Sequence, residues 1–256
     1  MAATAVEKPV ILFVHGAFHA PCHYTPLIKG IQRAGYTVLA PALPSSGPDA
    51  SIVGKALADD VARITEVAAP YLDAGRELVV MAHSFGGKPG TEFTGAQAVP
   101  ERKRRGLTGG VRAIVYLAAF APPGSPEQSK HHQGERAFFD LDRDSGTFVL
   151  RPNAAQIFYG VDMPDSQTRQ ILYSLLGRQS AASLGAPHTF SAAELQVPRT
   201  YVVCTRDEAV VPQAQRDMAE GCSARIVEID AGHSPWFVDG HVEKLVEVVE
   251  AAAGLK

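Results

Sequence analysis

Short runs of apolar and often β-branched residues recur along the chain without the polar alternation of a half-exposed sheet. Such runs are typical of strands that are buried on both faces of a parallel sheet. Six of them predict strands, at 10–14, 37–42, 78–82, 111–120, 200–204 and 224–229. Segments between them place apolar residues three and four positions apart, most clearly over 56–72 and 242–252, which predicts helices. The alternation predicts an α/β fold with a doubly wound, mainly parallel six-stranded sheet.

Almost eighty residues between the fourth and fifth predicted strands break this alternation. The interval holds too many large apolar side chains for a linker. They are Phe138, Phe139, Phe148, Phe158, Tyr159, Met163 and Tyr173. Ligands bind outside the carboxyl ends of the strands in open α/β sheets, so we expect the insertion to cover that crevice as a helical cap. The predicted domains are a core of residues 1–121 and 197–256 and a cap of residues 122–196. Most of the aromatic side chains would form the core of the cap, and a few would line a pocket.

Composition narrows the class of protein and of partner. The 256 residues, 46% of them hydrophobic and 20% charged, predict a compact protein whose core needs no disulfide or metal. A net charge of −3 argues against nucleic acid or a membrane surface as the main partner. We therefore expect a small apolar molecule as the partner. The sequence leaves it open whether the protein forms a homodimer. The three cysteines lack a paired spacing and the first residues lack a secretory signal, so we expect a cytoplasmic protein.

The residues after the third predicted strand suggest a nucleophile. Residues 79–87 read Val-Val-Met-Ala-His-Ser-Phe-Gly-Gly, an apolar strand that runs into a turn of small residues. This fits the nucleophile elbow G-x-S-x-G, with Ala82 in the place of the first glycine. The sharp turn strains the serine backbone and needs small residues two positions before and after it, here Ala82 and Gly86. Ser84 would stand above the strand end, although so short a pattern also fits an ordinary strand-to-helix turn.

An acid and a histidine follow in the order that a Ser-His-Asp triad on such a sheet requires. Asp207 lies just past the predicted strand 200–204, and His233 lies just past 224–229. His233 would act as the general base, and Asp207 would hold its imidazole in the right tautomer. Glu208 is the rival for the acid, and Asp207 is preferred because its shorter side chain follows the strand more closely.

Two backbone amides are expected to face a developing oxyanion. The Phe85 amide lies at the start of the helix after Ser84, where amides bind negative charge. The second donor should come from the loop after the first strand, with Ala17 and Phe18 as candidates. Ala17 is preferred because Gly16, directly before it, lets the backbone turn inward.

Four stretches together resemble one family. They are His15-Gly16-Ala17-Phe18, Ala82-His83-Ser84-Phe85-Gly86-Gly87, Asp207 ahead of Val211-Pro212, and Ala231-Gly232-His233-Ser234-Pro235. They resemble α/β-hydrolases of the plant methylesterase and hydroxynitrile lyase group and their fungal relatives, over nearly the whole chain. The resemblance implies the α/β-hydrolase fold with a compact lid, the catalytic triad Ser84, Asp207 and His233, and an oxyanion hole from the amides of Ala17 and Phe85.

Two departures from the family pattern bear on function. Hydroxynitrile lyases of this group have a lysine directly after the catalytic histidine, where this chain has Ser234, which argues against cyanohydrin cleavage. Lys88-Pro89 places a proline in the first turns of the helix after Ser84, where proline is tolerated.

No cofactor and no metal are expected. The glycines form neither a dinucleotide fingerprint nor a phosphate loop. Histidines and a cysteine gather at His15, His19, Cys22 and His23, and a pair follows at 131–132, but neither group has a zinc-ligand spacing. His19 is better explained as a pocket wall or a loop-packing residue.

The sequence therefore predicts a serine esterase or lactonase that cleaves a small to medium apolar substrate through an acyl-enzyme. The expected substrate-binding residues are Gly16, Phe18, His19, Phe158 and Trp236, and packing beneath the histidine is an equal alternative for Trp236. Two other functions stay open. The same residues could perform a non-hydrolytic C–C cleavage, elimination or cyclisation on a natural-product intermediate, or the fold could serve as a small-molecule receptor.

Overall fold

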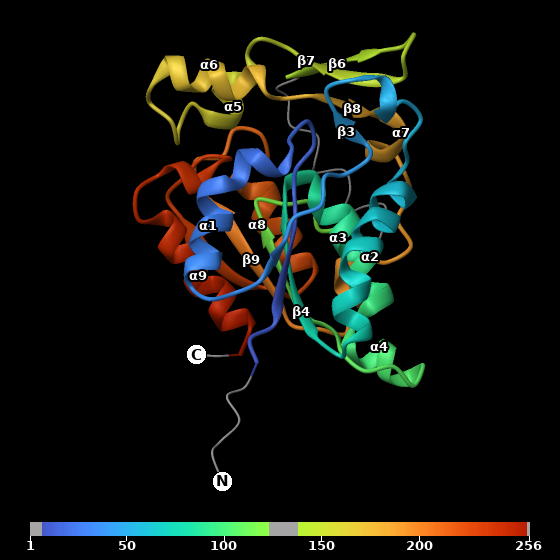
Figure 1. The fold of residues 1–256 in the computed structure, drawn as a ribbon. Helices are drawn as coiled ribbons and strands as arrows, with labels where there is room; N and C mark the ends of the chain where they lie inside the picture. The colour runs from blue at the N-terminus through green and yellow to red at the C-terminus, as the bar shows by residue number, and fades with distance from the viewer. Residues whose placement is uncertain (1–6, 123–137, 255–256) are drawn as a thin grey trace.

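A parallel sheet forms the centre of the protein in the computed structural model, which describes residues 7–122 and 138–254 (Figure 1). Its strands are β1 (Val10–Val14), β2 (Val38–Leu39), β4 (Glu77–His83), β5 (Gly110–Leu117), β9 (Arg199–Cys204) and β10 (Arg225–Ile229). They lie in the order β10-β9-β5-β4-β1-β2, and every neighbouring pair is parallel. The predicted six-stranded parallel sheet is confirmed.

Helices cover both faces of this sheet, as the apolar runs predict (Figure 1). All five residues of β1 are buried, and they alternate between two separate hydrophobic clusters. One cluster lies under α1 (Thr25–Arg33) and α9 (His241–Ala252). The other lies under α2 (Leu57–Asp73), α3 (Gly87–Gln97) and α8 (Pro212–Gly221), and the short α4 (Val99–Arg104) follows α3. No helix in the described part of the chain is both long and apolar enough to span a bilayer.

Two strands are shorter than predicted. The strand expected at 37–42 pairs only over Val38–Leu39, because it is the edge strand and both residues are partly exposed. The strand expected at 111–120 ends at Leu117, because Ala118 adopts a left-handed φ of 44° that breaks the extended backbone.

The segment between β5 and β9 contains strands as well as helices, so the expectation of a helical cap was incomplete. Its helices are α5 (Ala154–Tyr159), α6 (Ser166–Ser174) and α7 (Ala181–Leu184). Its strands are β6 (Phe139–Asp142), β7 (Thr147–Leu150) and β8 (Arg178–Ser180). These strands join β3 (Ser46–Gly47), from the loop after β2, in an antiparallel sheet of order β3-β8-β7-β6. The domain limits stay a prediction, and residues 123–137 of the expected cap, with the histidines at 131–132, lie outside the described residues.

The segment lies above the carboxyl ends of the sheet (Figure 1), and its aromatic residues pack against one another in a cluster of their own. Phe158 and its neighbours form a small hydrophobic cluster that also contains Phe18 from the loop after β1. The Phe18 ring lies 5.8 Å from the ring of Phe139 and 6.4 Å from that of Phe158, measured between centroids. The cap therefore contacts the core directly at the loop expected to bind an oxyanion.

Candidate active site

Ser84 lies at a sharp turn directly after β4, one of the two central strands of the sheet, where η3 (Ser84–Gly86) leads into α3. Its φ is 52°, in the left-handed region that non-glycine residues rarely adopt. Its carbonyl accepts a hydrogen bond of 3.0 Å from the Phe120 amide, which holds the turn. Ser84 is partly exposed, whereas His83 and Phe85 on either side are buried.

The turn leaves no room for side chains at the two glycines that follow. A Cβ at Gly86 would lie 2.4 Å from the carbonyl oxygen of Val14, and one at Gly87 would lie 2.1 Å from that of Phe120. Backbone atoms cannot give way at such distances. The need for a small residue two positions after Ser84 thus comes from the close approach of the neighbouring strand β1.

The loop after β1 lies against Ser84. A Cβ added at Gly16 would be 3.0 Å from the Cβ of Ser84, so this glycine allows the two backbones to meet. Phe18 has a φ of 65°, and its amide donates to the Oε1 of Gln179 in β8 at 3.3 Å. Within residues 7–122 and 138–254 the Ala17 amide donates to no protein group, which leaves Ala17 rather than Phe18 as the candidate oxyanion donor.

His233 and Asp207 form a buried pair at the ends of β10 and β9. The Nδ1 of His233 donates to the Oδ2 of Asp207 at 2.8 Å, and both side chains are almost fully buried. Gln215 of α8 donates to the same oxygen at 2.9 Å, while the amides of Ala209 and Val210 donate to Oδ1 at 2.7 and 3.0 Å. Donors surround the carboxylate, which fixes the imidazole with its Nε2 as the remaining acceptor. The carboxylate that accepts from His233 belongs to Asp207, the acid that the sequence favours over Glu208.

A buried histidine links the two halves of the site. The Nε2 of His83 donates to the carbonyl of His233 at 2.9 Å, and its Nδ1 accepts from the Tyr24 hydroxyl at 2.8 Å. The same hydroxyl accepts from the Gly16 amide at 2.9 Å. Burial holds the pKa of His83 well below its usual range, so the ring is neutral and can play both roles. Tyr24 was not predicted from the sequence as part of the site, and His83 was noted only as a variable position of the nucleophile-elbow motif.

The cap closes over these residues. The Phe158 ring stacks on the His233 ring at 5.6 Å between centroids, with an interplanar angle of 26°. The Tyr159 hydroxyl lies 3.0 Å from the Nε2 of His19, whose Nδ1 donates to the Ala17 carbonyl at 2.8 Å. Burial also holds the pKa of His19 well below its usual range, so His19 is a neutral bridge between the cap and the Ala17 loop.

Residues 11–248 match the model of the alpha/beta hydrolase family. The chain belongs to this family. It is 29% identical over 258 residues to the probable hydrolase R7 of a Phoma species, covering 98% of this chain and 100% of the relative. It is 25% identical over 261 residues to the pyrethroid hydrolase of Sphingobium wenxiniae, covering 93% and 85% of the two chains.

Solved structures of the family show the same fold. A crystal structure of polyneuridine aldehyde esterase superposes with a TM-score of 0.75 over 96% of this chain and 99% of its own, at 18% identity. The predicted resemblance to α/β-hydrolases with plant esterase-like relatives is confirmed.

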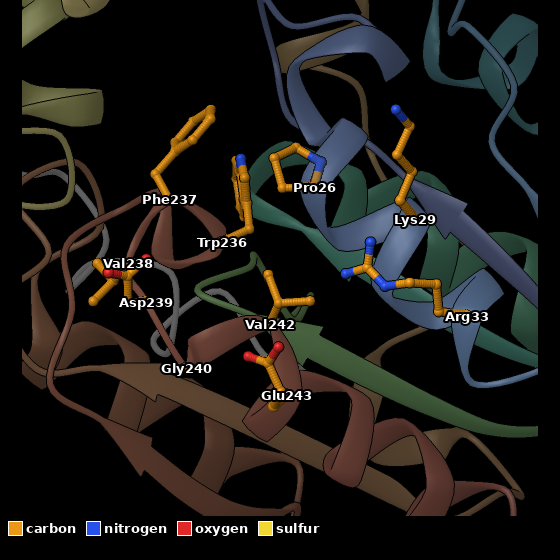
Figure 2. A pocket seen from close by; sticks show the side chains of 10 residues that line it. All are labelled: Pro26, Lys29, Arg33, Trp236, Phe237, Val238, Asp239, Gly240, Val242 and Glu243. Carbon is orange, nitrogen blue, oxygen red and sulfur yellow. The ribbon is translucent and has the colours of Figure 1, made fainter.

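Trp236 of this alpha/beta hydrolase lies beneath the loop that carries His233. Its ring centroid is 4.5 Å from that of Tyr24 and 5.0 Å from that of His83, and its Nε1 donates to the His23 carbonyl at 2.9 Å. Trp236 is almost fully buried, and it is one of the residues that line a hollow of about 280 Å³ between α1 and the start of α9. Figure 2 shows Trp236 on one side of this hollow and α1 side chains opposite. These contacts favour the packing alternative for Trp236.

The other histidines after β1 are held by backbone groups rather than grouped for a metal. The Nδ1 of His15 donates to the Gly16 carbonyl at 2.9 Å, and its Nε2 accepts from the Leu43 amide at 3.0 Å. Among the described residues, no three His, Cys, Asp or Glu side chains are placed to bind a metal ion. Lys88, which departs from the family pattern, donates to the carbonyls of Leu184 and Ala186 and so ties α3 to the end of α7.

A buried carboxylate is connected to Phe18, in the loop after β1, by a chain of hydrogen bonds that passes through the cap. Asp60 of α2 accepts from the amide and the hydroxyl of Ser45 at 3.0 and 2.6 Å. The Ser45 hydroxyl in turn accepts from the Nε2 of Gln179, whose Oε1 accepts from the Phe18 amide. Burial raises the pKa of Asp60 to about 6, against the hydrogen bonds from Ser45.

This raised pKa predicts how stability depends on pH. The native state binds the Asp60 proton more tightly than the unfolded chain does. The unfolding free energy that this proton contributes is therefore complete below pH 4 and is lost as the pH rises through about 6. Relative to Asp60→Asn, the parent should lose about 2 kcal/mol of unfolding free energy between pH 4 and 7, measured by urea unfolding. Asp73→Asn, exposed at the end of the same helix, should follow the parent. Parallel curves for parent and Asp60→Asn would contradict the assignment.

Proposed function

We propose that the chain is a serine hydrolase that cleaves a small to medium, apolar carboxylic ester or lactone. The observation that carries this proposal is the buried His233–Asp207 pair at the same edge of the sheet as Ser84, which sits partly exposed on a left-handed turn. A strained serine at the same edge of the sheet as an oriented imidazole is the arrangement that nucleophilic catalysis requires. The family and the relatives support a hydrolase.

In the proposed mechanism the Ser84 hydroxyl attacks the substrate carbonyl while the Nε2 of His233 takes its proton. Asp207 holds the other ring nitrogen and stabilises the imidazolium that forms. The amides of Ala17 and Phe85 donate to the oxyanion, and His233 returns the proton to the leaving alcohol. A water molecule, activated by the same imidazole, then attacks the acyl-enzyme and releases Ser84.

The surroundings of His233 support an apolar substrate. The Phe158 ring covers the imidazole, and Phe18 joins the same aromatic cluster. Phe18, Phe158, Gly16 and His19 therefore remain the proposed substrate-binding residues. A pyrethroid hydrolase among the relatives is consistent with an apolar ester, although identity with it is only 25%.

Hydrolysis in ¹⁸O-labelled water tests this proposal. We expect p-nitrophenyl esters of short and medium acyl chains to be cleaved, with one ¹⁸O atom in each carboxylic acid product. Product that forms from an activated intermediate without ¹⁸O uptake would favour the lyase or cyclase alternative. Tight binding of apolar esters without any turnover would favour a receptor.

A further inference from the structure

A buried carboxylate from the cap grips the loop that carries His233. Asp162 lies between α5 and α6 and is only 3% exposed. Its Oδ1 accepts from the Gly232 amide at 2.7 Å, and its Oδ2 accepts from the Ser234 amide at 2.7 Å. The two amides flank His233, so one side chain spans the residue proposed as the general base.

The loop is shaped to receive this carboxylate. A Cβ at Gly232 would lie 2.8 Å from the Oδ2 of Asp162 and 2.7 Å from the Cβ of Val161, so glycine permits the close approach. Both carboxylate oxygens act as acceptors of N–H groups. An asparagine could satisfy only one of the two amides and would turn its own N–H₂ group toward the other. The geometry thus suits a carboxylate and no neutral isostere.

We propose that Asp162 is a positioning residue for His233, an inference that rests on the proposed serine hydrolase function. Two short hydrogen bonds from the flanking amides fix the backbone that carries the imidazole. The carboxylate also places a negative charge near the imidazolium that forms during attack. Because Asp162 belongs to the cap, docking of the cap and placement of the base are coupled.

The other titratable groups near this position are held neutral; burial, with Asp207 and Asp162, raises the pKa of the Cys204 thiol well above its usual range. His233 meets Asp207 at its Nδ1, the His83 ring at 4.6 Å and, further away, His19. Burial keeps the pKa of His83 and of His19 well below their usual range, so neither becomes charged near neutral pH. His241 at the start of α9 also interacts electrostatically with Asp162, and burial lowers the pKa of His241. Asp207 and Asp162 therefore both place a carboxylate near His233.

The test compares three variants of the full chain in the hydrolysis of one p-nitrophenyl ester. Asp162→Asn removes the charge and one hydrogen bond, so we expect kcat to fall about 10- to 100-fold with KM within about threefold. The acid limb of the kcat/KM profile should move to lower pH, because an anion that favours the imidazolium is lost. Asp162→Glu keeps the charge but displaces it, so kcat should fall while the acid limb stays in place.

Asp165→Asn is the matched control from the same loop. Asp165 is exposed and caps α6 by accepting from the Thr168 amide at 2.7 Å, a role that asparagine also performs. This control should match the parent in kcat, KM and pH profile. Hydrogen exchange at the Gly232 and Ser234 amides, which needs no turnover, should speed up in Asp162→Asn and not in Asp165→Asn.

The outcomes separate this inference from the proposed function. If Asp162→Asn keeps the kcat and the acid limb of the parent, or loses only thermal stability, Asp162 does not position the base. If Asp162→Asn does not fold, Asp162→Glu decides by the same criterion on kcat. A parent that hydrolyses no ester, or whose activity survives Ser84→Ala, overturns the proposed function, and the role of Asp162 falls with it.

Discussion

Ser84→Ala is expected to reduce the hydrolysis of p-nitrophenyl esters by about 10⁵-fold or more, because the attacking oxygen is lost and no acyl-enzyme can form. The fold should persist. Alanine meets the same strain as serine at a φ of 52°, and the Ser84 carbonyl still accepts from the Phe120 amide. Steady-state rates and thermal melting, measured together, separate loss of the nucleophile from loss of structure.

Ser223 offers a matched control for this variant. It also has a φ of 52°, but it lies exposed after α8 and away from His233. Ser223→Ala removes the same hydroxyl from the same backbone conformation and should leave kcat and KM at the values of the parent. If Ser84→Ala retained more than a few per cent of the parent rate, the attacking group would have to be sought elsewhere.

Asp207→Asn is expected to lower kcat by about 10⁴-fold with little change in fold. The carboxylate accepts from His233 and Gln215 at one oxygen and from two backbone amides at the other. An asparagine that keeps the backbone bonds turns its N–H₂ group toward His233. The imidazole must then accept at Nδ1 and carry its proton on Nε2, where it cannot take the proton of Ser84.

Glu208→Gln is the control for this prediction, because Glu208 is the next residue in the chain and the rival acid in the sequence. The bond from His233 goes to Asp207, so Glu208→Gln should hydrolyse the ester at the parent rate. A larger loss from Glu208→Gln than from Asp207→Asn would reverse the assignment of the acid.

The sheet could be predicted from the sequence because burial on both faces leaves a continuous local signal. The residues of β1 alternate between two hydrophobic clusters, and the predicted run 10–14 has the limits of the observed strand. A strand at the edge of the sheet leaves a weaker hydrophobic pattern in the sequence. The strand predicted at 37–42 is therefore only the short β2 in the structure. In the cap, β7 depends on pairing with β6 and β8, which no local pattern reveals.

The candidate site likewise contains residues that could be predicted from the sequence and residues that could not. Ser84, Asp207 and His233 each follow a recognisable strand, so their order along the chain predicts a shared edge of the sheet. Tyr24 lies in η1 (Pro21–Tyr24) and Asp162 lies in the cap, so neither stands directly at a strand end, and both reach the site through contacts between residues distant in sequence. Such supporting contacts depend on packing and could not be predicted from spacing.

The most direct test of the account is to find the covalent intermediate by mass spectrometry. The parent protein is mixed with a fluorophosphonate, or with an aryl ester and quenched in acid within milliseconds, and the intact mass and tryptic peptides are measured. We predict one adduct, on the peptide that contains Ser84, formed by the parent and by Ser223→Ala and absent from Ser84→Ala. Continued ester hydrolysis with no adduct on Ser84, or an adduct on another residue, would contradict the account.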